Sequence, residues 1–114
     1  MLKSVPLAGL KPADREAALN EVVLMRSFRH ANLCRYEWAW EEEGALHILM
    51  EHCAGGDLAQ LLARGVPLDE DQIWEVVIGL AEGLRYLHEH RVLHRDLKPS
   101  NIFLDVAGCR AVIG

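Results

Sequence analysis

The chain has little positive charge, no paired cysteines and no long apolar run, and each of these absences excludes a class of protein. There are 12 Lys and Arg residues against 17 Asp and Glu residues, which gives a net charge of −5 at pH 7. A general nucleic-acid-binding protein needs a basic surface for the phosphates, so this balance argues against that function. No apolar run approaches membrane-spanning length, and Lys3, Pro6 and Gly9 interrupt the stretch that a signal peptide would need.

The three cysteines are odd in number and far apart, at positions 34, 53 and 109. They form no CxxC pair and no zinc-binding spacing, so we expect reduced thiols in a protein of the cytoplasm or the nucleus. Three histidines lie close together in the second half, but no cysteine or carboxylate cluster completes a metal site around His88, His90 and His94. The length of 114 residues gives room for one modest domain.

The first half of the chain combines strand and helix patterns. Residues 2–7 predict a short strand, and Pro12 suits the first turn of a helix that ends before His30. Apolar residues recur in this segment at helical spacing and predict one buried face: Ala17, Ala18, Val22, Leu24, Met25 and Phe28. Two apolar runs, residues 33–40 and 45–50, flank a polar turn at residues 41–44 and predict a β-hairpin.

The second half is predicted to be mainly helical, after a flexible joint at Gly55 and Gly56. Asp57 and Asp69 each stand three residues before a glutamine, a spacing typical of helix N-caps, so two helices are expected to start there. The second of these helices is long and carries a predicted buried stripe: Ile73, Val76, Val77, Leu80, Ala81, Leu84 and Leu87. A second small hairpin is predicted near the C-terminus, with strands at residues 102–104 and 111–113 and a turn at residues 105–108.

Residues 94–101, with the sequence H-R-D-L-K-P-S-N, carry side chains that suit phosphoryl transfer. A carboxylate such as Asp96 can orient a hydroxyl nucleophile and accept its proton. Lys98 supplies positive charge for phosphate oxygens, on which negative charge builds up in the transition state. Asn101 can hold a magnesium ion through its side-chain oxygen. The alternative is a charged turn without chemistry, since Asp, Asn and Pro are ordinary turn residues.

The order H-R-D-L-K-P-x-N resembles the catalytic-loop signature of protein kinases, and a lysine two places after the aspartate is similar to the serine/threonine branch. Eight consecutive matches favour the catalytic interpretation over the charged turn. The segments L-K-x-V-P-L, A-L-N-E-V, G-G-D-L and S-N-I-F-L together most resemble the NIMA-related kinases.

The resemblance implies an α+β fold, a protein kinase-like two-lobed fold that is incomplete in this chain. Residues 1–50 would form part of the small lobe, with an antiparallel sheet and one helix, residues 51–57 the hinge, and residues 58–114 the start of the helical large lobe. The implied reaction transfers the γ-phosphate of ATP to serine or threonine hydroxyls of a protein substrate, with Mg²⁺ as cofactor. Neither nucleic acid nor a membrane is an expected partner.

The resemblance implies roles for residues of the loop. Asp96 would be the catalytic base, Lys98 would contact phosphates, and Asn101 would bind Mg²⁺. Arg95 is similar to the arginine that binds a phosphorylated activation loop in kinases switched on by phosphorylation.

Outside the loop, Lys3 is similar to the lysine that holds the nucleotide phosphates, and Glu21 to the glutamate that pairs with that lysine. The alternative for both is a solvated surface charge. The resemblance also implies a set of contacts to the adenosine of ATP: Met50 as gatekeeper, Glu51 and Cys53 in the hinge, Asp57 near the ribose and Phe103 beneath adenine. Core packing is the alternative for Met50 and Phe103, and helix capping is a second role for Asp57.

The resemblance departs from the family pattern at both ends. The glycine-rich phosphate loop would precede Lys3, and the D-F-G aspartate would stand about thirteen residues after Asn101, where this chain has Gly114. Two explanations stay open: the chain stops one residue short after a slightly longer hairpin, or glycine has replaced the aspartate. We expect a fragment that is marginally folded and inactive alone, and the alternative is a pseudokinase or truncated isoform that binds other proteins. The sequence does not specify the protein substrate, the activating signal or the oligomeric state.

Overall fold

The structure is a computed structural model that describes residues 1–105 and 110–114. The chain divides into two compact units. Unit 1 comprises Met1–Arg29 and Arg35–His52, and unit 2 comprises His30–Cys34 and Cys53–Gly114. The predicted assignment of residues 1–50, 51–57 and 58–114 to a small lobe, a hinge and a large lobe stays a prediction.

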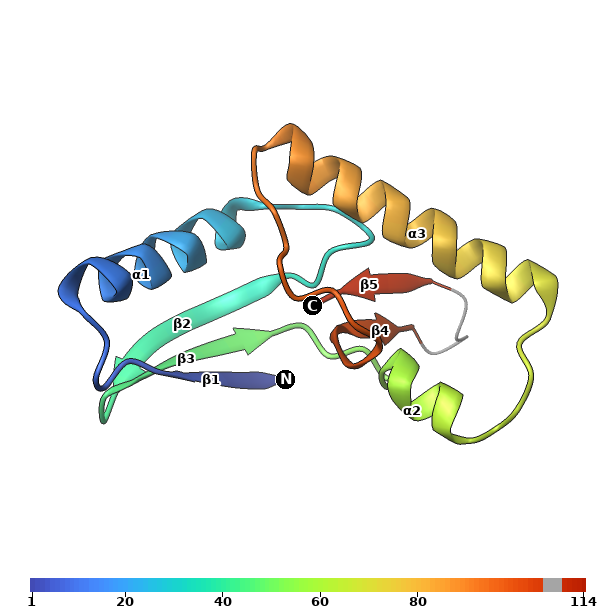
Figure 1. Ribbon diagram of the computed structural model, residues 1–114, viewed down its shortest axis with the longest axis horizontal. Coiled ribbons are helices and arrows are strands. Elements are labelled where there is room, and N and C mark those ends of the chain that lie inside the picture. The colour runs from blue at the N-terminus through green and yellow to red at the C-terminus, as the bar shows by residue number, and fades with distance from the viewer. Residues whose placement is uncertain (106–109) are drawn as a thin grey trace. The chain divides into compact units, whose positions relative to one another are not determined.

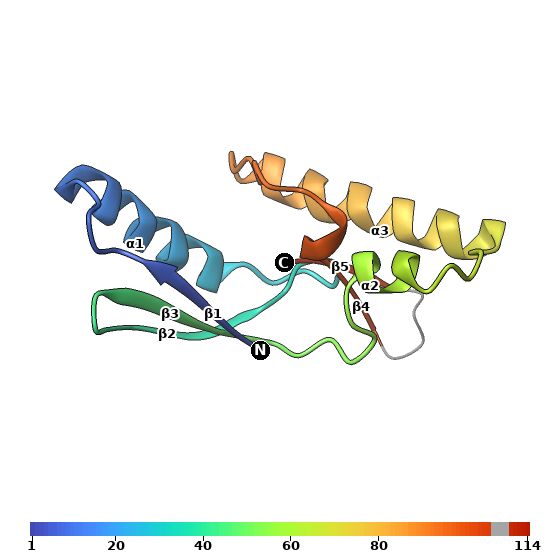
Figure 2. The ribbon, with the colours of Figure 1, turned by 60° about the horizontal axis from the view of Figure 1, so that its bottom comes forward.

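Unit 1 is a three-stranded antiparallel sheet with one helix on one of its faces (Figures 1 and 2). The strand order is β1-β3-β2, and the elements are β1 (Leu2–Pro6), α1 (Pro12–Ser27), β2 (Tyr36–Glu42) and β3 (Ala45–Met50). The central strand β3 buries every second residue, Leu46, Ile48 and Met50, as the two-residue period of a strand requires. This buried face of β3 forms one side of the small core of unit 1.

The predicted hairpin of unit 1 is confirmed, but β2 extends through Glu42, so the turn is shorter than the predicted residues 41–44. Glu43 and Gly44 both have positive φ, 51° and 74°, which is the backbone of a tight two-residue hairpin turn. β2 begins at Tyr36, three residues later than the sequence predicts. The earlier residues pair elsewhere, because Leu33 forms a parallel bridge with Ile113 and the Cys34 N–H donates to the Ile113 carbonyl at 2.8 Å.

The helix α1 begins at Pro12 as predicted, but it buries less of its apolar face than expected. Val22 is its buried residue, and Phe28 is buried just after its end. Ala17 and Leu24, which the pattern assigned to the buried face, are exposed. A cavity of about 120 Å³ lies beneath the helix, lined by Ala18, Glu21 and Val22 of α1 and by residues of the three strands.

Unit 2 is built around the long helix and the second predicted hairpin, which is confirmed (Figure 1). Its elements are α2 (Leu58–Ala63), α3 (Glu70–Glu89), the 3₁₀ turn η1 (Pro99–Asn101), β4 (Ile102–Leu104) and β5 (Ala111–Ile113). The core consists of buried Val76, Ile102, Leu104 and Ala111, with Leu58, Leu61 and Leu80 packed against it. Of the predicted turn at residues 105–108, only Asp105 is described. Residues 106–108 and Cys109 lie outside the described residues.

Both predicted helix starts in unit 2 are confirmed as reciprocal capping boxes. The Asp57 carboxylate accepts from the Gln60 N–H at 2.8 Å, and the Gln60 side chain accepts from the Asp57 N–H at 3.1 Å. Asp69 and Gln72 repeat the arrangement with the same two distances. Each box satisfies two backbone donors that a helix start would otherwise leave without partners.

The buried face of α3 is narrower than the predicted stripe and is rotated from it. The helix buries Val76, Gly79, Gly83 and Leu87, whereas Ile73 and Val77 are 47% and 46% exposed. A Cβ at Gly79 would lie 2.8 Å from the Asn32 amide nitrogen, and a Cβ at Gly83 would lie 2.9 Å from the Asn32 carbonyl oxygen. The two glycines therefore admit the segment around Asn32 to the helix surface, and the larger apolar residues turn outward.

The outward side of α3 carries an exposed apolar surface: Ile73, Trp74, Val77 and Ile78. Two of these residues, Ile73 and Val77, belong to the stripe that the sequence predicts to be buried. In the described part of the chain, no helix combines the length and the apolar character that a membrane span requires.

Candidate active site

The chain enters residues 94–101 through a sharp stop at the end of α3. The Val92 N–H donates to the Leu87 carbonyl at 2.9 Å, and the Arg91 N–H donates to the His88 carbonyl at 3.0 Å. These two bonds are the Schellman pattern of a helix C-terminus, and Arg91 takes the left-handed position with φ 60°. The motif turns the backbone away from the helix axis and toward the loop.

His94 connects the start of the loop to the end of β5. Its Nε2–H donates to the Gly114 carbonyl at 2.7 Å, and its Nδ1 accepts from the Asp96 N–H at 3.2 Å. These partners assign the neutral tautomer with the proton on Nε2, because Nδ1 must carry a lone pair. The ring thereby connects the backbone of Asp96 to Gly114 at the end of β5.

Three of the four predicted loop residues lie in mutual contact. The Asn101 amide nitrogen donates to the Asp96 backbone carbonyl at 2.9 Å and to its Oδ2 at 3.1 Å, and the Lys98 ammonium lies 3.5 Å from Asp96 Oδ1. The Asp96 side chain is 67% exposed and that of Lys98 54% exposed. An ion pair so open to solvent adds little to stability, so the arrangement leaves an oriented carboxylate that a substrate can approach.

The local sequence explains why these side chains meet. Proline disfavours the helical region for the residue before it, and Lys98 is extended at φ −154°, ψ 161°. Pro99 then occupies the first position of η1, and the Asn101 N–H closes the turn on the Lys98 carbonyl at 2.9 Å. This turn brings Asn101 back beside Asp96.

Arg95, the fourth predicted loop residue, lies apart from this cluster. It is exposed, and its backbone has φ 69°, a left-handed conformation that costs a non-glycine residue about 1 kcal/mol or more. Its predicted contact with a phosphorylated segment stays a prediction.

The loop offers one oxygen that fits a magnesium ion. Because the Asn101 amide nitrogen is bonded to Asp96, its Oδ1 is the atom left for a metal. Magnesium sites also use carboxylates, and within residues 1–105 and 110–114 no three His, Cys, Asp or Glu side chains gather around a possible metal position.

Two of the residues assigned to the nucleotide lie side by side in unit 2. The Gly55 N–H donates to the Leu104 carbonyl at 3.0 Å, the Leu104 N–H donates to the Gly56 carbonyl at 2.9 Å, and Asp57 bridges to Phe103. Gly55 permits this approach, since a Cβ there would lie 2.7 Å from the Leu104 carbonyl oxygen. The last residues of the predicted hinge thus run along β4, and Asp57 lies next to the half-buried Phe103.

The three residues assigned to the gatekeeper and hinge are held by backbone bonds. Met50 is buried at the end of β3, and its N–H donates to the Met1 carbonyl at 2.7 Å. The Glu51 N–H donates to the Arg35 carbonyl at 2.9 Å, and the buried Cys53 accepts from the Gly56 N–H at 3.2 Å. Their contacts to adenine stay predictions.

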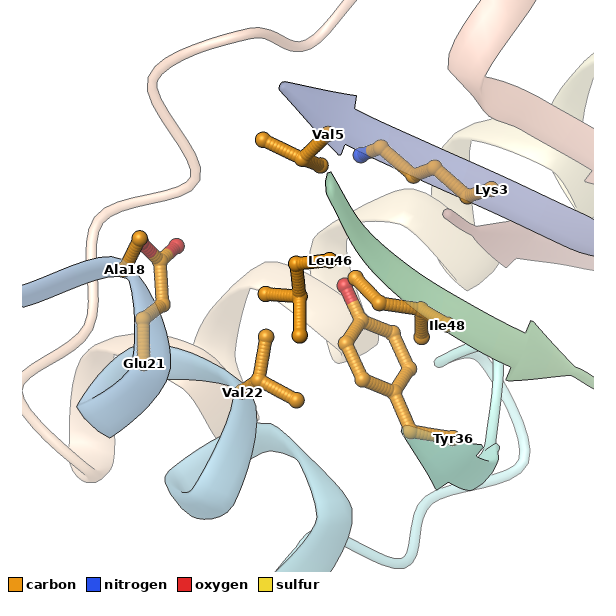
Figure 3. A pocket seen from close by; sticks show the side chains of 8 residues that line it. All are labelled: Lys3, Val5, Ala18, Glu21, Val22, Tyr36, Leu46 and Ile48. Atoms are coloured by element: carbon orange, nitrogen blue, oxygen red, sulfur yellow. The ribbon is translucent and has the colours of Figure 1, made fainter. Parts of the chain in front are cut away.

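Lys3 and Glu21 both line the cavity beneath α1, but they do not pair. Figure 3 shows the Lys3 ammonium and the Glu21 carboxylate on opposite sides of this cavity, with Val5 and Leu46 between them. No ion pair joins the two charges within the described residues. The predicted pair is thus absent from this structure, since the cavity separates the two side chains.

Sequence reasoning missed the role of Asn32. Its side-chain amide donates to the Ala111 carbonyl at 2.8 Å, and its backbone carbonyl accepts from the Ile113 N–H at 2.8 Å. Asn32 therefore holds β5 against α3. It also helps to position the Gly114 carbonyl, which follows β5 and accepts the hydrogen bond from His94. The available signal was the pair of glycines four residues apart in the long helix, Gly79 and Gly83, since such a pair indicates a close approach of another segment.

A family model described as the protein kinase domain matches residues 1–111 of the chain. The chain belongs to the protein kinase family. Its curated relatives include the serine/threonine-protein kinase Nek5 of Mus musculus, which is 44% identical over 105 residues; the match covers 89% of the chain and 16% of Nek5. Nek5 of Homo sapiens is 35% identical over 116 residues, covering 100% of the chain and 16% of that protein. The predicted similarity to the NIMA-related serine/threonine kinases is confirmed.

The kinase fold is confirmed by a solved structure as well. The crystal structure of Rad53 1–466 in complex with AMP-PNP matches with a TM-score of 0.86 at 23% identity, covering 98% of the chain and 29% of that structure. The chain therefore has the α+β kinase fold in part, and it spans 16% of the length of the Nek5 relatives.

Proposed function

We propose that residues 1–114 supply the catalytic loop and part of the nucleotide site of a kinase that transfers the γ-phosphate of ATP to serine or threonine hydroxyls of proteins. The observation that supports this most strongly is the cluster of Asp96, Lys98 and Asn101. One Asp96 oxygen accepts from the Asn101 amide, and the other lies beside the Lys98 ammonium. A charged turn without a catalytic role would not require this arrangement. The serine/threonine branch is supported by the Nek relatives.

In the proposed reaction the substrate hydroxyl oxygen attacks the γ-phosphorus, and the bond from that phosphorus to the β–γ bridging oxygen breaks. The hydroxyl proton passes to the Asp96 carboxylate, and ADP leaves with the electron pair of the broken bond. Lys98 lies near enough to Asp96 to move onto the transferring phosphate, where its charge lowers the barrier. Asn101 fixes the direction of the Asp96 carboxylate.

ATP as the phosphate donor is supported by the fold and by the AMP-PNP bound to the Rad53 protein. Phe103 would contact adenine and Asp57 the ribose, from adjacent positions in unit 2. Lys3 would hold phosphates, which requires α1 to approach the strands so that Glu21 reaches it. Met50, Glu51 and Cys53 would contact adenine.

Mg²⁺ is proposed as the companion of ATP, with Asn101 Oδ1 as one ligand. It would neutralise charge on the phosphates. A carboxylate ligand is also expected, since Mg²⁺ at nucleotide sites is bound through one or two carboxylates together with the phosphates. Arg95, which is exposed within the loop, is proposed to bind a phosphorylated segment.

A chimera tests this function without depending on the activity of the 114 residues alone. The matching region of mouse Nek5 is replaced by residues 1–114, and the protein is incubated with γ-labelled ATP and a casein substrate. We expect acid-stable label on serine or threonine. Label only on tyrosine, or release of inorganic phosphate alone by a chimera that melts like Nek5 and binds ATP, would contradict the proposal. The Lys98→Gln chimera is the matched variant, in which transfer should fall at least tenfold.

A further inference from the structure

The face of the unit 1 sheet that points away from α1 carries a row of exposed apolar side chains. The buried residues of β3 line the cavity beneath α1, so Leu49, which lies between two of them, is on the opposite face. The antiparallel register pairs Leu49 with Leu2 of β1 on one side and with Trp38 of β2 on the other. Their exposed fractions are 41% for Leu49, 56% for Leu2 and 58% for Trp38. An apolar row open to solvent therefore crosses all three strands.

The next row of the same face is ordered by contacts between its own side chains. The Ser4 hydroxyl and His47 Nδ1 share a hydrogen bond of 2.8 Å, and the His47 ring stacks on Trp40 with 5.3 Å between the ring centroids. The Trp40 Nε1–H in turn donates to the Glu42 carboxylate at 3.3 Å. The face thus has a defined surface beside its apolar row.

The hairpin that contributes β2 and β3 is strongly acidic. Residues 36–50 include four Glu residues and neither Lys nor Arg. Two of the four carboxylates pair with arginines outside the hairpin, whereas Glu42 and Glu43 form no ion pair with any residue that the structure describes. Negative charge without a partner, next to open apolar surface, is complementary to a segment that brings both apolar and basic side chains.

We propose that this outer sheet face is a docking surface for a helical segment of a partner protein that carries apolar and basic side chains. A sheet buries an apolar face against a helix or a second sheet, and α1 already packs on the opposite side. A second copy of the chain is disfavoured, because each copy has a net charge of −5 and the same acidic hairpin. The outer sheet face consists of Leu2, Ser4, Trp38, Trp40, Glu42, His47 and Leu49.

Docking on this face is independent of the proposed phosphate transfer. Lys3 pairs in register with the buried Ile48, and Met50 is buried on that same side of β3. Both residues assigned to the nucleotide on these strands therefore lie on the face toward α1, and a partner on the outer sheet face leaves them open. Failure of one proposal does not imply failure of the other.

Calorimetric titration with a synthetic peptide tests the docking, in the full chain and in the Nek5 chimera. The probe is the acetylated and amidated peptide K-L-L-K-A-L-K-K-L-L-K-A, in which Leu and Lys recur at helical spacing. We expect saturable binding to both proteins. The same peptide with Glu in place of every Lys should bind at least about tenfold more weakly. No saturable binding, binding that is lost in the chimera, or equal binding of the two peptides would overturn the inference.

Substitutions in the apolar row locate the bound peptide. Trp38→Thr together with Leu49→Thr keeps residues that suit strands and should weaken binding at least about tenfold. The matched control is the exposed apolar surface of α3, where Trp74→Ala together with Val77→Ala should change the affinity by less than about twofold. An equal or larger loss from the α3 pair would place the peptide on α3 and overturn the inference.

The charge of the hairpin is tested with a substitution that keeps the shape of the side chain and needs no change in the sheet. Glu42→Gln should weaken peptide binding about threefold at low salt, and this loss should vanish at about 1 M salt. Glu75→Gln, at an exposed residue of α3, removes the same charge and should have no effect. Equal losses from both would assign the binding to net charge. Sedimentation that shows dimers of the free chain, abolished by Trp38→Thr, would assign the face to a second copy. Either result would overturn the inference.

Discussion

The loop of residues 94–101 in unit 2 and the helix–sheet core of unit 1 differ in how closely the structure brings their predicted functional residues together. In unit 2, Asp96, Lys98 and Asn101 contact one another, and His94 ties the loop to the end of β5. In unit 1, Lys3 and Glu21 lie on opposite sides of a cavity of about 120 Å³. The loop residues of unit 2 are therefore in contact in this structure, and Lys3 and Glu21 of unit 1 are not.

The difference follows from the distance along the chain over which each site is built. Asp96 and Asn101 are five residues apart, and a single turn started by Pro99 brings them together. Lys3 and Glu21 belong to a strand and a helix, so their contact depends on how closely α1 packs on the sheet. A short motif can carry its geometry in its own backbone, whereas a long-range pair depends on the core between its elements.

The largest expected effect is in unit 2, where Leu87 is 1% exposed. Leu87→Ala removes most of a buried side chain and should lower the free energy of unfolding by about 2–5 kcal/mol. Hydrogen exchange of α3 and β5, followed by mass spectrometry, measures the loss. Leu93→Ala is the matched control, since Leu93 is 62% exposed, and should change little. Equal effects of the two variants would show that α3 is not the core helix of this unit.

Val22→Ala should weaken unit 1 by a smaller amount, about 1–2.5 kcal/mol, because Val22 is buried but borders a cavity. The faster exchange should be confined to α1 and the strands of unit 1. Val23→Ala, at a neighbouring residue that is 69% exposed, is the control. If Val22→Ala speeds exchange in α3 as strongly as in α1, the two units are not independent in stability.

Arg91→Gly should stabilise the entry to the catalytic loop by up to about 1 kcal/mol, since Arg91 has φ 60° at the position where glycine is preferred. Urea unfolding measures the gain through the midpoint. Arg91→Ala removes the same charge but keeps the Cβ, so it should give no gain. A gain of equal size from both substitutions would assign the effect to charge.

The smallest effect is expected for the Lys3 and Glu21 charges. A double-mutant cycle with Lys3→Met and Glu21→Gln should give a coupling within about 0.3 kcal/mol of zero in the free chain, because the two groups are exposed and unpaired with each other. Urea unfolding of the four proteins measures it. A coupling above about 1 kcal/mol would mean that the Lys3–Glu21 ion pair forms without nucleotide. The predicted residues of unit 1 would then be in contact, as those of the loop in unit 2 are.

Much of the fold follows from local sequence signals. The capping boxes at Asp57 and Asp69 and the starting Pro12 predict three helices, and short apolar runs on either side of a turn predict the strands of both hairpins. The errors arise where tertiary contacts override the local pattern. Residues 33 and 34 read as strand but pair with Ile113, and the stripe predicted on α3 ignores that Gly79 and Gly83 admit another segment.

The site shows the same division. The eight-residue motif predicted the cluster of Asp96, Lys98 and Asn101, because the spacing and Pro99 suffice to form it. The pairing of Lys3 with Glu21 could not be predicted from spacing, since it depends on the packing of α1. The tie from His94 to Gly114 also depends on the register of β4 with β5, which the sequence leaves unspecified.

The central claim is that Asp96 is the catalytic base of a kinase loop assembled within unit 2. Its most direct test is the turnover of the Nek5 chimera with Asp96→Asn, a substitution that keeps the shape of the side chain, measured beside the unsubstituted chimera at saturating ATP. We predict that turnover falls by about 10²–10⁴-fold, with the KM for ATP and the melting temperature unchanged. Unchanged turnover in a folded chimera would contradict the account.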